Sequence, residues 1–270
     1  MTQAHKGTAL VTGASSGIGA LYADRLAEQG YDLILVARSA DKLRDLARTI
    51  SDSTGRSVEV VQADLADPAQ LRRIEQVLST DASITMLVNN AGVGATAPLL
   101  GSDIDAMQAM IALNVVAPTR LAYAVAPAFV ARGRGTIVNI ASIVAIAPEL
   151  LNGVYGGSKA FVLAFTRSLQ HELADKGVRV QAVLPGATAT DFWGIAGTPV
   201  EHLPGEIVMP ATAMVDAALA GLELGEVVTI PSLPDAADWQ RFEAARDILR
   251  PNLSRAVPAE RYFSAASKVR

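Results

Sequence analysis

The stretch Thr12-Gly13-Ala14-Ser15-Ser16-Gly17-Ile18-Gly19 decides how this chain folds. It follows an apolar run at residues 8–12 and precedes a segment in which apolar residues recur at helical spacing as far as Gly30. This order predicts a strand, a tight glycine turn and a helix. Backbone amides and the helix dipole at such a helix start favour a bound phosphate group, and glycines let a pyrophosphate approach the backbone.

The spacing of these glycines, G-x-x-x-G-x-G, differs from the G-x-G-x-x-G of the common dinucleotide fingerprint. The prediction of a phosphate site therefore rests on the mechanism and not on that motif. The alternative is a glycine-rich turn that only lets the helix pack closely on the strand.

The same alternation of strand and helix continues outward from this turn. Strands are predicted at residues 8–12, 33–37, 58–62, 86–89, 137–141, 178–184 and 227–230. Strands that are apolar on both faces and separated by helices are typical of a parallel sheet with helices on both sides. The sequence predicts an α/β fold of the Rossmann type, a doubly wound sheet of about seven parallel strands.

Length and composition limit the classes of function. The chain has 270 residues, half of them hydrophobic, so a single domain over residues 1–270 is expected. A net charge of -4 provides no basic surface for a phosphate backbone, which favours a small molecule over nucleic acid as the partner. The chain has no cysteine, and its three histidines lack metal-ligand spacing with acids, so no metal site is expected.

No targeting segment or membrane span is predicted. Residues 1–7 are short and polar, and the most apolar windows contain Pro118, Arg120 and Pro127, which leaves fewer than the ~20 clean apolar residues a spanning helix needs. A cytoplasmic protein without a membrane partner is expected.

Two stretches interrupt the alternation of strands and helices. Residues 189–210 are rich in glycine, proline and apolar residues, and residues 231–270 follow the last strand. Long irregular segments in compact domains are usually lids or binding loops, so residues 189–210 are predicted to form a substrate lid. Residues 231–270 are a C-terminal tail, in which Trp239, Phe242, Ile248 and Leu249 lie near helical spacing and suit packing on the domain or on another subunit.

Tyr155 and Lys159 form the candidate catalytic pair. They lie four residues apart on a predicted helix and therefore on one face, with about 5–6 Å between their Cβ atoms. A phenol has a reference pKa near ~10, and an adjacent ammonium favours the phenolate, so Lys159 is expected to lower the pKa of Tyr155. Most Tyr-x-x-x-Lys pairs are surface pairs, but Ser142 follows a predicted strand, whose carboxyl end would bring its hydroxyl to the mouth of the sheet.

Together these motifs resemble the short-chain dehydrogenase/reductase family over residues 6–230. The residues that carry the resemblance, in the family's order and spacing, are Thr12–Gly19, Asn89-Asn90-Ala91-Gly92, Asn114, Ser142, Tyr155-x-x-x-Lys159 and Pro185-Gly186. The resemblance implies hydride transfer between nicotinamide and a carbonyl or alcohol, with Tyr155 as proton donor and acceptor. It implies that Ser142 binds the substrate oxygen, that Lys159 holds the nicotinamide ribose, and that Asn114 orders a proton-relay water. It also implies a homodimer or homotetramer through the helices that hold Asn114 and Tyr155.

The resemblance further implies cofactor contacts at the glycine turn, at the ends of the following strands and in the loop after the sixth strand. These residues are Gly13, Ser15, Ser16, Gly17, Ile18, Gly19, Arg38, Ser39, Asp64, Leu65, Asn90, Ala91, Gly92, Tyr155, Lys159, Pro185, Gly186, Thr188 and Thr190.

The end of the second predicted strand favours NADP(H) over NAD(H). An acid at this place accepts hydrogen bonds from a free ribose 2′-hydroxyl, whereas an arginine matches a 2′-phosphate. Here Ala37 stands where a carboxylate would be expected, and Arg38 follows. The alternative is that Arg38 is a solvated surface residue and that Ser39 caps the next helix. Asp64 has two possible roles as well, contacting the adenine ring or capping the helix after Pro68.

The segments expected around the nicotinamide, residues 93–100, 143–154 and 192–209, are mainly apolar and contain no lysine or arginine. A charged substrate would be left unpaired there, so a neutral, hydrophobic ketone, aldehyde or secondary alcohol is expected. Alternatively, these side chains only pack the core and lid.

Two functions other than carbonyl or alcohol turnover are alternatives. They are a catalytically silent NADP(H)-binding regulator or scaffold and a sugar-nucleotide epimerase of the extended group. The intact Ser142, Tyr155 and Lys159 argue against the first, and the short chain argues against the second.

Overall fold

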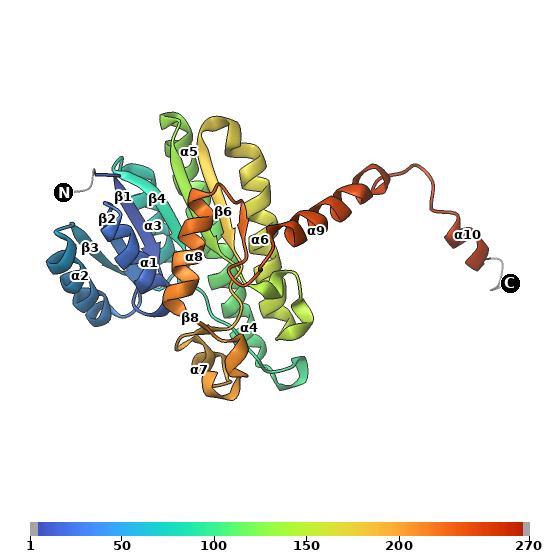
Figure 1. Ribbon diagram of the computed structural model, residues 1–270, viewed down its shortest axis with the longest axis horizontal. Helices are drawn as coiled ribbons and strands as arrows, with labels where there is room; N and C mark the ends of the chain where they lie inside the picture. Colours follow the sequence, from blue (N-terminus) through green and yellow to red (C-terminus); the bar gives the residue numbers. More distant parts are fainter. Residues whose placement is uncertain (1–4, 267–270) are drawn as a thin grey trace. The chain divides into compact units, whose positions relative to one another are not determined.

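The computed structural model describes residues 5–266, which divide into two compact units (Figure 1). The first unit extends to Pro231 and the second begins at Ser232. Each is described by itself.

A seven-stranded parallel sheet forms the centre of the first unit, in the order β3-β2-β1-β4-β5-β6-β9. The strands are β1 (Thr8–Thr12), β2 (Asp32–Ala37), β3 (Val58–Gln62), β4 (Ile84–Asn89), β5 (Gly135–Ile140), β6 (Val178–Val183) and β9 (Val228–Thr229). The predicted Rossmann-type fold is therefore confirmed. The strand order reverses between β1 and β4, and the crevice at the carboxyl ends of the strands on such a reversal is where open α/β sheets bind ligands.

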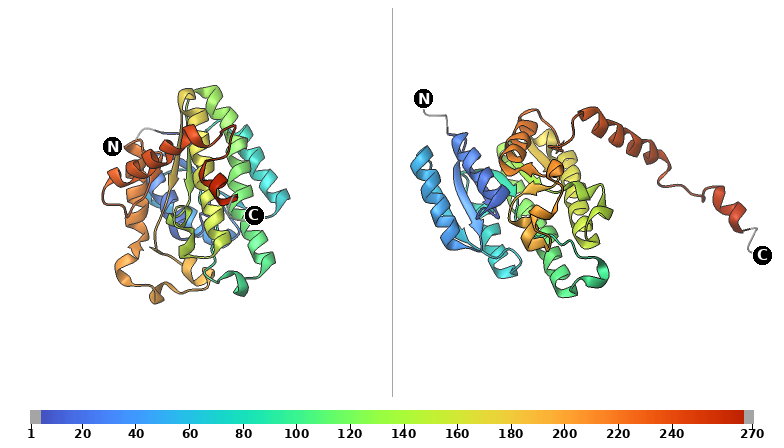
Figure 2. Two further views of the ribbon diagram at one scale, coloured as in Figure 1. Left: turned by 90° about the vertical axis from the view of Figure 1, so that its right-hand side faces the viewer. Right: turned by 60° about the horizontal axis from the view of Figure 1, so that its bottom comes forward.

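Helices cover both faces of the sheet (Figures 1 and 2). Successive residues of a strand point to opposite faces, and Val11 of β1 packs in one core cluster while its neighbour Leu10 packs in the other. The first face carries α1 (Gly17–Glu28), α2 (Ala40–Thr54) and α8 (Ala211–Glu223), and the second carries α3 (Pro68–Thr80), α5 (Ala117–Arg132) and α6 (Gly153–Leu173). Burial on both faces explains why the strands are almost continuously apolar.

One long helix contradicts part of the sequence prediction. Helix α4 (Ile104–Ile111), the π-helical turn η2 (Ala112–Val116) and α5 join into a continuous helix whose length and mean hydropathy of 1.4 would suffice to cross a membrane. Pro118 and Pro127 were expected to interrupt this run, but Pro118 lies at the start of α5 directly after the π turn, and Pro127 lies inside α5. Core helices pass the same test, and α5 packs Leu121 and Phe129 into the core against α3.

The remaining segments of the first unit lie between the main elements. They are the strands β7 (Thr188–Ala189) and β8 (Met209–Pro210), helix α7 (Phe192–Ala196), and the short 3-10 helices η1 (Leu99–Gly101), η3 (Ile143–Ala145), η4 (Pro148–Leu150), η5 (Ala174–Lys176), η6 (Val200–His202) and η7 (Gly205–Ile207). β7 and β8 pair in parallel, so the two ends of the segment predicted to be a lid, residues 189–210, lie side by side.

The second unit contains α9 (Ala236–Leu249), η8 (Arg250–Asn252) and α10 (Arg261–Ala266). Asp235 caps α9 by accepting a hydrogen bond from the Ala237 amide, and the rings of Trp239 and Phe242 stack with their centroids 5.1 Å apart. No residue of α9 is buried.

Candidate active site

The glycine turn after β1 has the conformation that its glycines permit. Gly13 and Gly17 adopt positive φ angles of 66° and 54°. A Cβ on Gly13 would lie 2.9 Å from the Ala91 Cα, and one on Gly19 would lie 2.8 Å from the carbonyl carbon of Gly13. Any larger residue would therefore strain or fill this turn.

Asn90 holds the turn in place. Its Nδ2 donates to the carbonyl oxygens of Thr12 (2.9 Å) and Gly13 (3.2 Å), and its own amide donates to Thr12 Oγ1 (3.0 Å). The resemblance implied that Asn90 contacts the cofactor. The structure gives its side chain a role in shaping the turn, and the cofactor contact stays a prediction.

The end of β2 presents Arg38 to solvent. Its carbonyl oxygen accepts a hydrogen bond from Gln62 Nε2, whereas its guanidinium makes no ion pair within residues 5–266. Ser39 is the N-cap residue of α2, but its side chain makes no capping hydrogen bond, so the predicted capping role is wrong. The Ser39 backbone is extended with ψ 95°, and the hydroxyl stays available to another partner.

Asp64 also differs from one of its two predicted roles. The cap of α3 is Asp67, which accepts from the amides of Ala69 (2.8 Å) and Gln70 (2.9 Å), while Asp64 Oδ1 accepts from the Ala66 amide. Asp67 directly precedes Pro68, the first residue of α3, so it and not Asp64 is placed to cap that helix. Leu65, the next predicted contact, has its side chain buried in the core.

Ser142, Tyr155 and Lys159 meet at the carboxyl end of β5. Ser142 follows β5, and the other two lie one turn apart near the start of α6, where Asn152 caps the helix by accepting from the Val154 and Tyr155 amides. Ser142 Oγ donates to the Pro185 carbonyl oxygen and accepts from the Val144 amide, each at 3.4 Å, and it lies near enough to the Tyr155 phenol to lower its pKa. Lys159 Nζ lies 5.9 Å from the centroid of the Tyr155 ring. Lys159 Nζ also donates to the Ile140 carbonyl oxygen at 2.9 Å. All three side chains are buried.

Burial dominates the protonation of this pair. It raises the pKa of Tyr155 to about 12, although the nearby Ser142 hydroxyl acts in the opposite direction. It lowers the pKa of Lys159 to about 8. The expected lowering of the Tyr155 pKa by Lys159 is therefore not found. Burial of a phenolate away from water is unfavourable, and this effect is larger than the stabilisation of the phenolate by neighbouring groups. Tyr155 is held as a neutral phenol, which is a proton donor.

Asn114 lies in the π turn and connects three parts of the site. Its Nδ2 donates to the Val93 carbonyl oxygen (2.8 Å) and to Ser158 Oγ (3.1 Å), and its Oδ1 accepts from the Val93 amide (3.0 Å). The alternative that it only bonds nearby helical backbone is wrong, since its partners lie after β4 and in α6. A Cβ on Gly92 would lie 3.1 Å from Asn114 Oδ1 and 3.4 Å from Lys159 Nζ. Gly92 therefore leaves room for both side chains.

A second buried polar chain, which the sequence prediction missed, ties the sheet to α6. Asn89 Nδ2 donates to Asn139 Oδ1, and Asn139 Nδ2 donates to Thr166 Oγ1, each at 2.9 Å. Thr166 lies eleven residues after Tyr155 and seven after Lys159, so the three share one face of α6. The available signal was an asparagine inside the otherwise apolar end of a strand, Ile137-Val138-Asn139-Ile140.

The loop after β6 connects this centre with residues 189–210, the predicted lid. The Pro185 carbonyl oxygen accepts from the Ile143 amide at 3.0 Å, and Thr188 Oγ1 donates to the Gly186 carbonyl oxygen at 3.1 Å. Thr190 lies against the glycine turn, because a Cβ on Gly17 would be 3.3 Å from its Cγ2. The lid therefore starts beside the predicted phosphate site.

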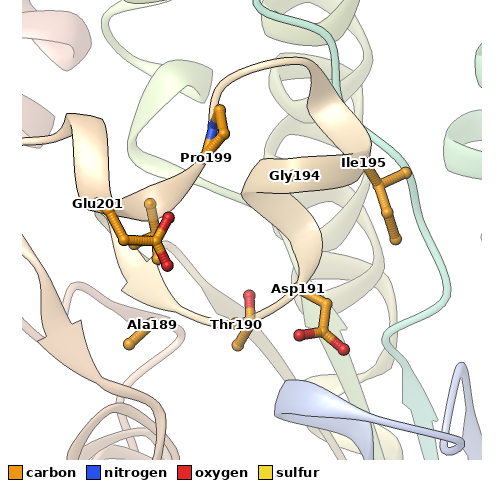
Figure 3. A pocket seen from close by; sticks show the side chains of 8 residues that line it. Ala189, Thr190, Asp191, Gly194, Ile195, Pro199 and Glu201 are labelled. Atoms are coloured by element: carbon orange, nitrogen blue, oxygen red, sulfur yellow. The ribbon is translucent and has the colours of Figure 1, made fainter.

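A cavity of about 480 Å³ opens at this start of the lid. Figure 3 shows α7 between Asp191 and Ile195 on one side of it, and Pro199 and Glu201 on the other. Two carboxylates and no lysine or arginine line the cavity. Ser142, Tyr155 and Lys159 do not line this cavity.

Comparison with known proteins agrees with this geometry. Residues 7–198 match the family model for short chain dehydrogenase. Human 17-beta-hydroxysteroid dehydrogenase type 3 is 36% identical over 67% of this chain and 59% of its own length, so the chain spans less than two thirds of that relative.

Two solved structures resemble the chain over nearly its whole length. A short-chain dehydrogenase from Sphingobium yanoikuyae in complex with NADPH is 48% identical, with a TM-score of 0.92 over 95% of this chain and 100% of its own. The bulky-bulky ketone specific alcohol dehydrogenase from Comamonas testosteroni is 43% identical, with a TM-score of 0.88 over 96% and 99% of the two chains.

Proposed function

The chain belongs to the short-chain dehydrogenase/reductase family, and we propose that it reduces a neutral, hydrophobic ketone or aldehyde with NADPH, or oxidises the matching secondary alcohol. One observation carries the proposal. Tyr155 is a buried neutral phenol that lies next to the Ser142 hydroxyl and beside the Lys159 side chain. A carbonyl oxygen bound next to Ser142 and Tyr155 would have the Tyr155 phenol as its proton donor.

The residues at the crevice fit a dinucleotide phosphate. Glycines stand where a Cβ would overlap the turn, and the helix α1 begins there with its amides directed at the crevice. Arg38 is exposed at the end of β2, where a ribose 2′-phosphate would lie, and Ser39 has a free hydroxyl beside it. The NADPH complex of the Sphingobium relative supports the choice of NADP(H) over NAD(H).

NADPH held at the glycine turn and Arg38 would be the source of the hydride for the carbonyl carbon. Tyr155 donates its phenolic proton to the carbonyl oxygen, and Ser142 holds that oxygen by a hydrogen bond. The Lys159 ammonium stabilises the phenolate that forms. Asn114, whose polar atoms contact Val93 and Ser158, positions α6 against the loop after β4.

The walls of the site support a neutral substrate. Apolar side chains of Val144, Met110, Val93 and Phe192 pack around Tyr155, and the adjoining cavity carries carboxylates but no cation. An anionic substrate would find no partner there. The ketone specificity of the Comamonas relative agrees with this substrate class.

We also propose a homodimer or homotetramer formed through α5 and α6. Tyr123 of α5 and Phe161 of α6 are exposed, and both stack with Phe165 at centroid distances of 6.4 and 5.7 Å. Exposed aromatic clusters of this kind suit a subunit interface. A cytoplasmic location stays a prediction from the sequence.

The test is a panel of ketones, aldehydes and carboxylate-bearing analogues, followed at the NADPH absorbance band. Neutral apolar ketones should be reduced, and Tyr155→Phe should lose about 10²–10⁴-fold in kcat while NADPH still binds. NADPH binding without turnover of any neutral substrate would instead support the silent regulator, and unchanged turnover in Tyr155→Phe would refute the role of the phenol.

A further inference from the structure

Phe192, on the first turn of α7, covers the catalytic tyrosine. Its ring centroid lies 5.8 Å from that of Tyr155 with an interplanar angle of 43°. Tyr155 is only 5% exposed, yet a substrate carbonyl has to come within hydrogen-bond distance of its hydroxyl. Whatever lies over this ring therefore limits what can reach it.

Gly94, in the loop after β4, allows the Phe192 ring to lie there. A Cβ on Gly94 would overlap the Phe192 ring, at 2.9 Å from Cε2 and closer still to Cζ. Gly94 does not have a positive φ, so its backbone conformation does not itself require glycine. The requirement comes from the aromatic ring, and the two residues form a matched pair.

The backbone around Phe192 is fastened on both sides. The Trp193 indole donates to the Thr188 carbonyl oxygen at 3.0 Å, and the Thr198 amide donates to the Trp193 carbonyl oxygen at 3.0 Å. Both the amide and the hydroxyl of Thr96 donate to the Ala196 carbonyl oxygen, at 3.0 and 3.1 Å. These bonds fix α7 to the loop after β4.

The Phe192 side chain itself is held only by apolar contacts. It is partly buried, packs with Tyr155 and the residues around it, and meets Trp193 edge-on at 5.7 Å. An aromatic side chain has two rotatable bonds and can turn without moving the backbone. The ring can therefore act as an adjustable wall on a fixed helix.

We propose that Phe192, admitted by Gly94, sets the largest substituent that a carbonyl substrate can carry on the lid side of Tyr155. This inference rests on the proposed ketone reduction and adds its specificity-determining residue. Shortening the Phe192 side chain opens space directly above the phenol, whereas adding a methyl at Gly94 forces the ring out of its place.

The experiment measures kcat/KM for dialkyl and aryl-alkyl ketones of increasing size with the full chain and NADPH. Phe192→Leu, Phe192→Val and Phe192→Ala should raise the ratio of kcat/KM for bulky over small ketones in that order, by about tenfold or more for alanine. Leu224→Ala, which shortens an apolar side chain at an exposed position at the end of α8, is the control and should leave the ratio unchanged. A ratio within twofold of the wild type across the three Phe192 variants would overturn the proposal.

A double-mutant cycle tests the pairing with Gly94. Gly94→Ala should lower kcat/KM for aryl ketones several-fold in the wild-type background and have almost no effect in the Phe192→Ala background, where the methyl meets no ring. Equal effects in both backgrounds would refute the pairing.

A binding readout separates this inference from the proposed function. The affinity of the NADP⁺ complex for a bulky secondary alcohol, measured by calorimetry, should rise in Phe192→Ala relative to that for a small alcohol. This shift can be observed even if no ketone in the panel is turned over, in which case only the proposed reaction fails. An unchanged affinity ratio, with active wild-type enzyme, rejects the size-setting role and leaves the reaction intact.

Discussion

Two cations stand at opposite ends of the candidate site, and their surroundings differ completely. Arg38, at the end of β2, is exposed and makes no ion pair within the described residues 5–266. Lys159, on α6, is 6% exposed and donates to the Ile140 carbonyl oxygen. Burial lowers the pKa of Lys159 to about 8.

The difference shows which part of the site lowers the stability of the fold. An exposed guanidinium stays hydrated and can be exchanged with effects on the ligand alone. A buried ammonium costs folding free energy, and such a cost is typical of a group kept for chemistry. The proposed catalytic end therefore depends on its packing, and the cofactor-selecting end depends on its charge.

Replacing the buried cation is expected to have the largest effect. Lys159→Met should abolish turnover and remove a pH-dependent part of the stability. In the wild type the native Lys159 releases its proton near pH 8, whereas the unfolded chain keeps it up to a pKa of 10.5. The unfolded state binds more protons between these values, so the free energy of unfolding should rise by about 2–3 kcal/mol from pH 8 to 10.

Urea unfolding at pH 8, 9 and 10 measures this rise, and Lys159→Met should lack it. The range stops at pH 10 because burial also raises the pKa values of Tyr22 and Tyr155. Above that pH the unfolded tyrosines lose protons that the native ones keep, and stability falls. The same slope in the variant and the wild type would contradict the assignment.

Reversing the charge at the exposed cation should give the next largest effect. Arg38→Asp is expected to reverse the preference for NADPH over NADH, by about 10–100-fold in the ratio of kcat/KM, because a carboxylate repels a 2′-phosphate and accepts hydrogen bonds from a free 2′-hydroxyl. Thermal unfolding without cofactor should be unchanged. Equal efficiency with both cofactors in the wild type would show that Arg38 does not select the cofactor.

The sequence predicted the fold because its strands are apolar on both faces and its turns are marked by glycine. It also predicted that Tyr155 and Lys159 share a helix face, since a spacing of four residues is a local property. The pKa of Tyr155 could not be read in this way. Its direction depends on burial among residues from other segments of the chain, such as Met110 and Phe192, which outweighs the lowering effect of Ser142.

Contacts between elements were the part that the sequence did not reveal. Ser39 and Asp64 are of residue types that often cap helices. In the structure the Ser39 hydroxyl makes no capping hydrogen bond to α2, and Asp67 instead of Asp64 caps α3. Asn139 and Thr166 are 27 residues apart on different elements, so no local pattern pairs them. Nothing in the sequence around Gly94 indicates that its missing side chain makes room for the ring of Phe192.

The polar chain beneath the catalytic pair gives the smallest and most specific prediction. Thr166→Val keeps the shape of the side chain but leaves Asn139 Nδ2 without its buried acceptor, which should lower the free energy of unfolding by about 1–2 kcal/mol. Thr166→Ser restores the acceptor and should recover most of this loss. Asn139 also accepts from Asn89 Nδ2, so Asn139→Leu alone would orphan that donor. The triple variant Thr166→Val, Asn139→Leu and Asn89→Leu removes every polar partner of the chain and should regain stability, since replacing buried partners together by apolar groups is nearly neutral.

Turnover distinguishes a positioning role from a purely structural one. If the bond between Asn139 and Thr166 fixes α6 relative to β5, the triple variant should still lose several-fold in kcat with little change in KM, because Lys159 and Tyr155 share the helix face of Thr166 while Ser142 follows β5. Stopped-flow reduction and urea unfolding on the same four proteins measure both quantities. Full kcat in the triple variant would show that this chain of hydrogen bonds stabilises the fold without placing the catalytic helix.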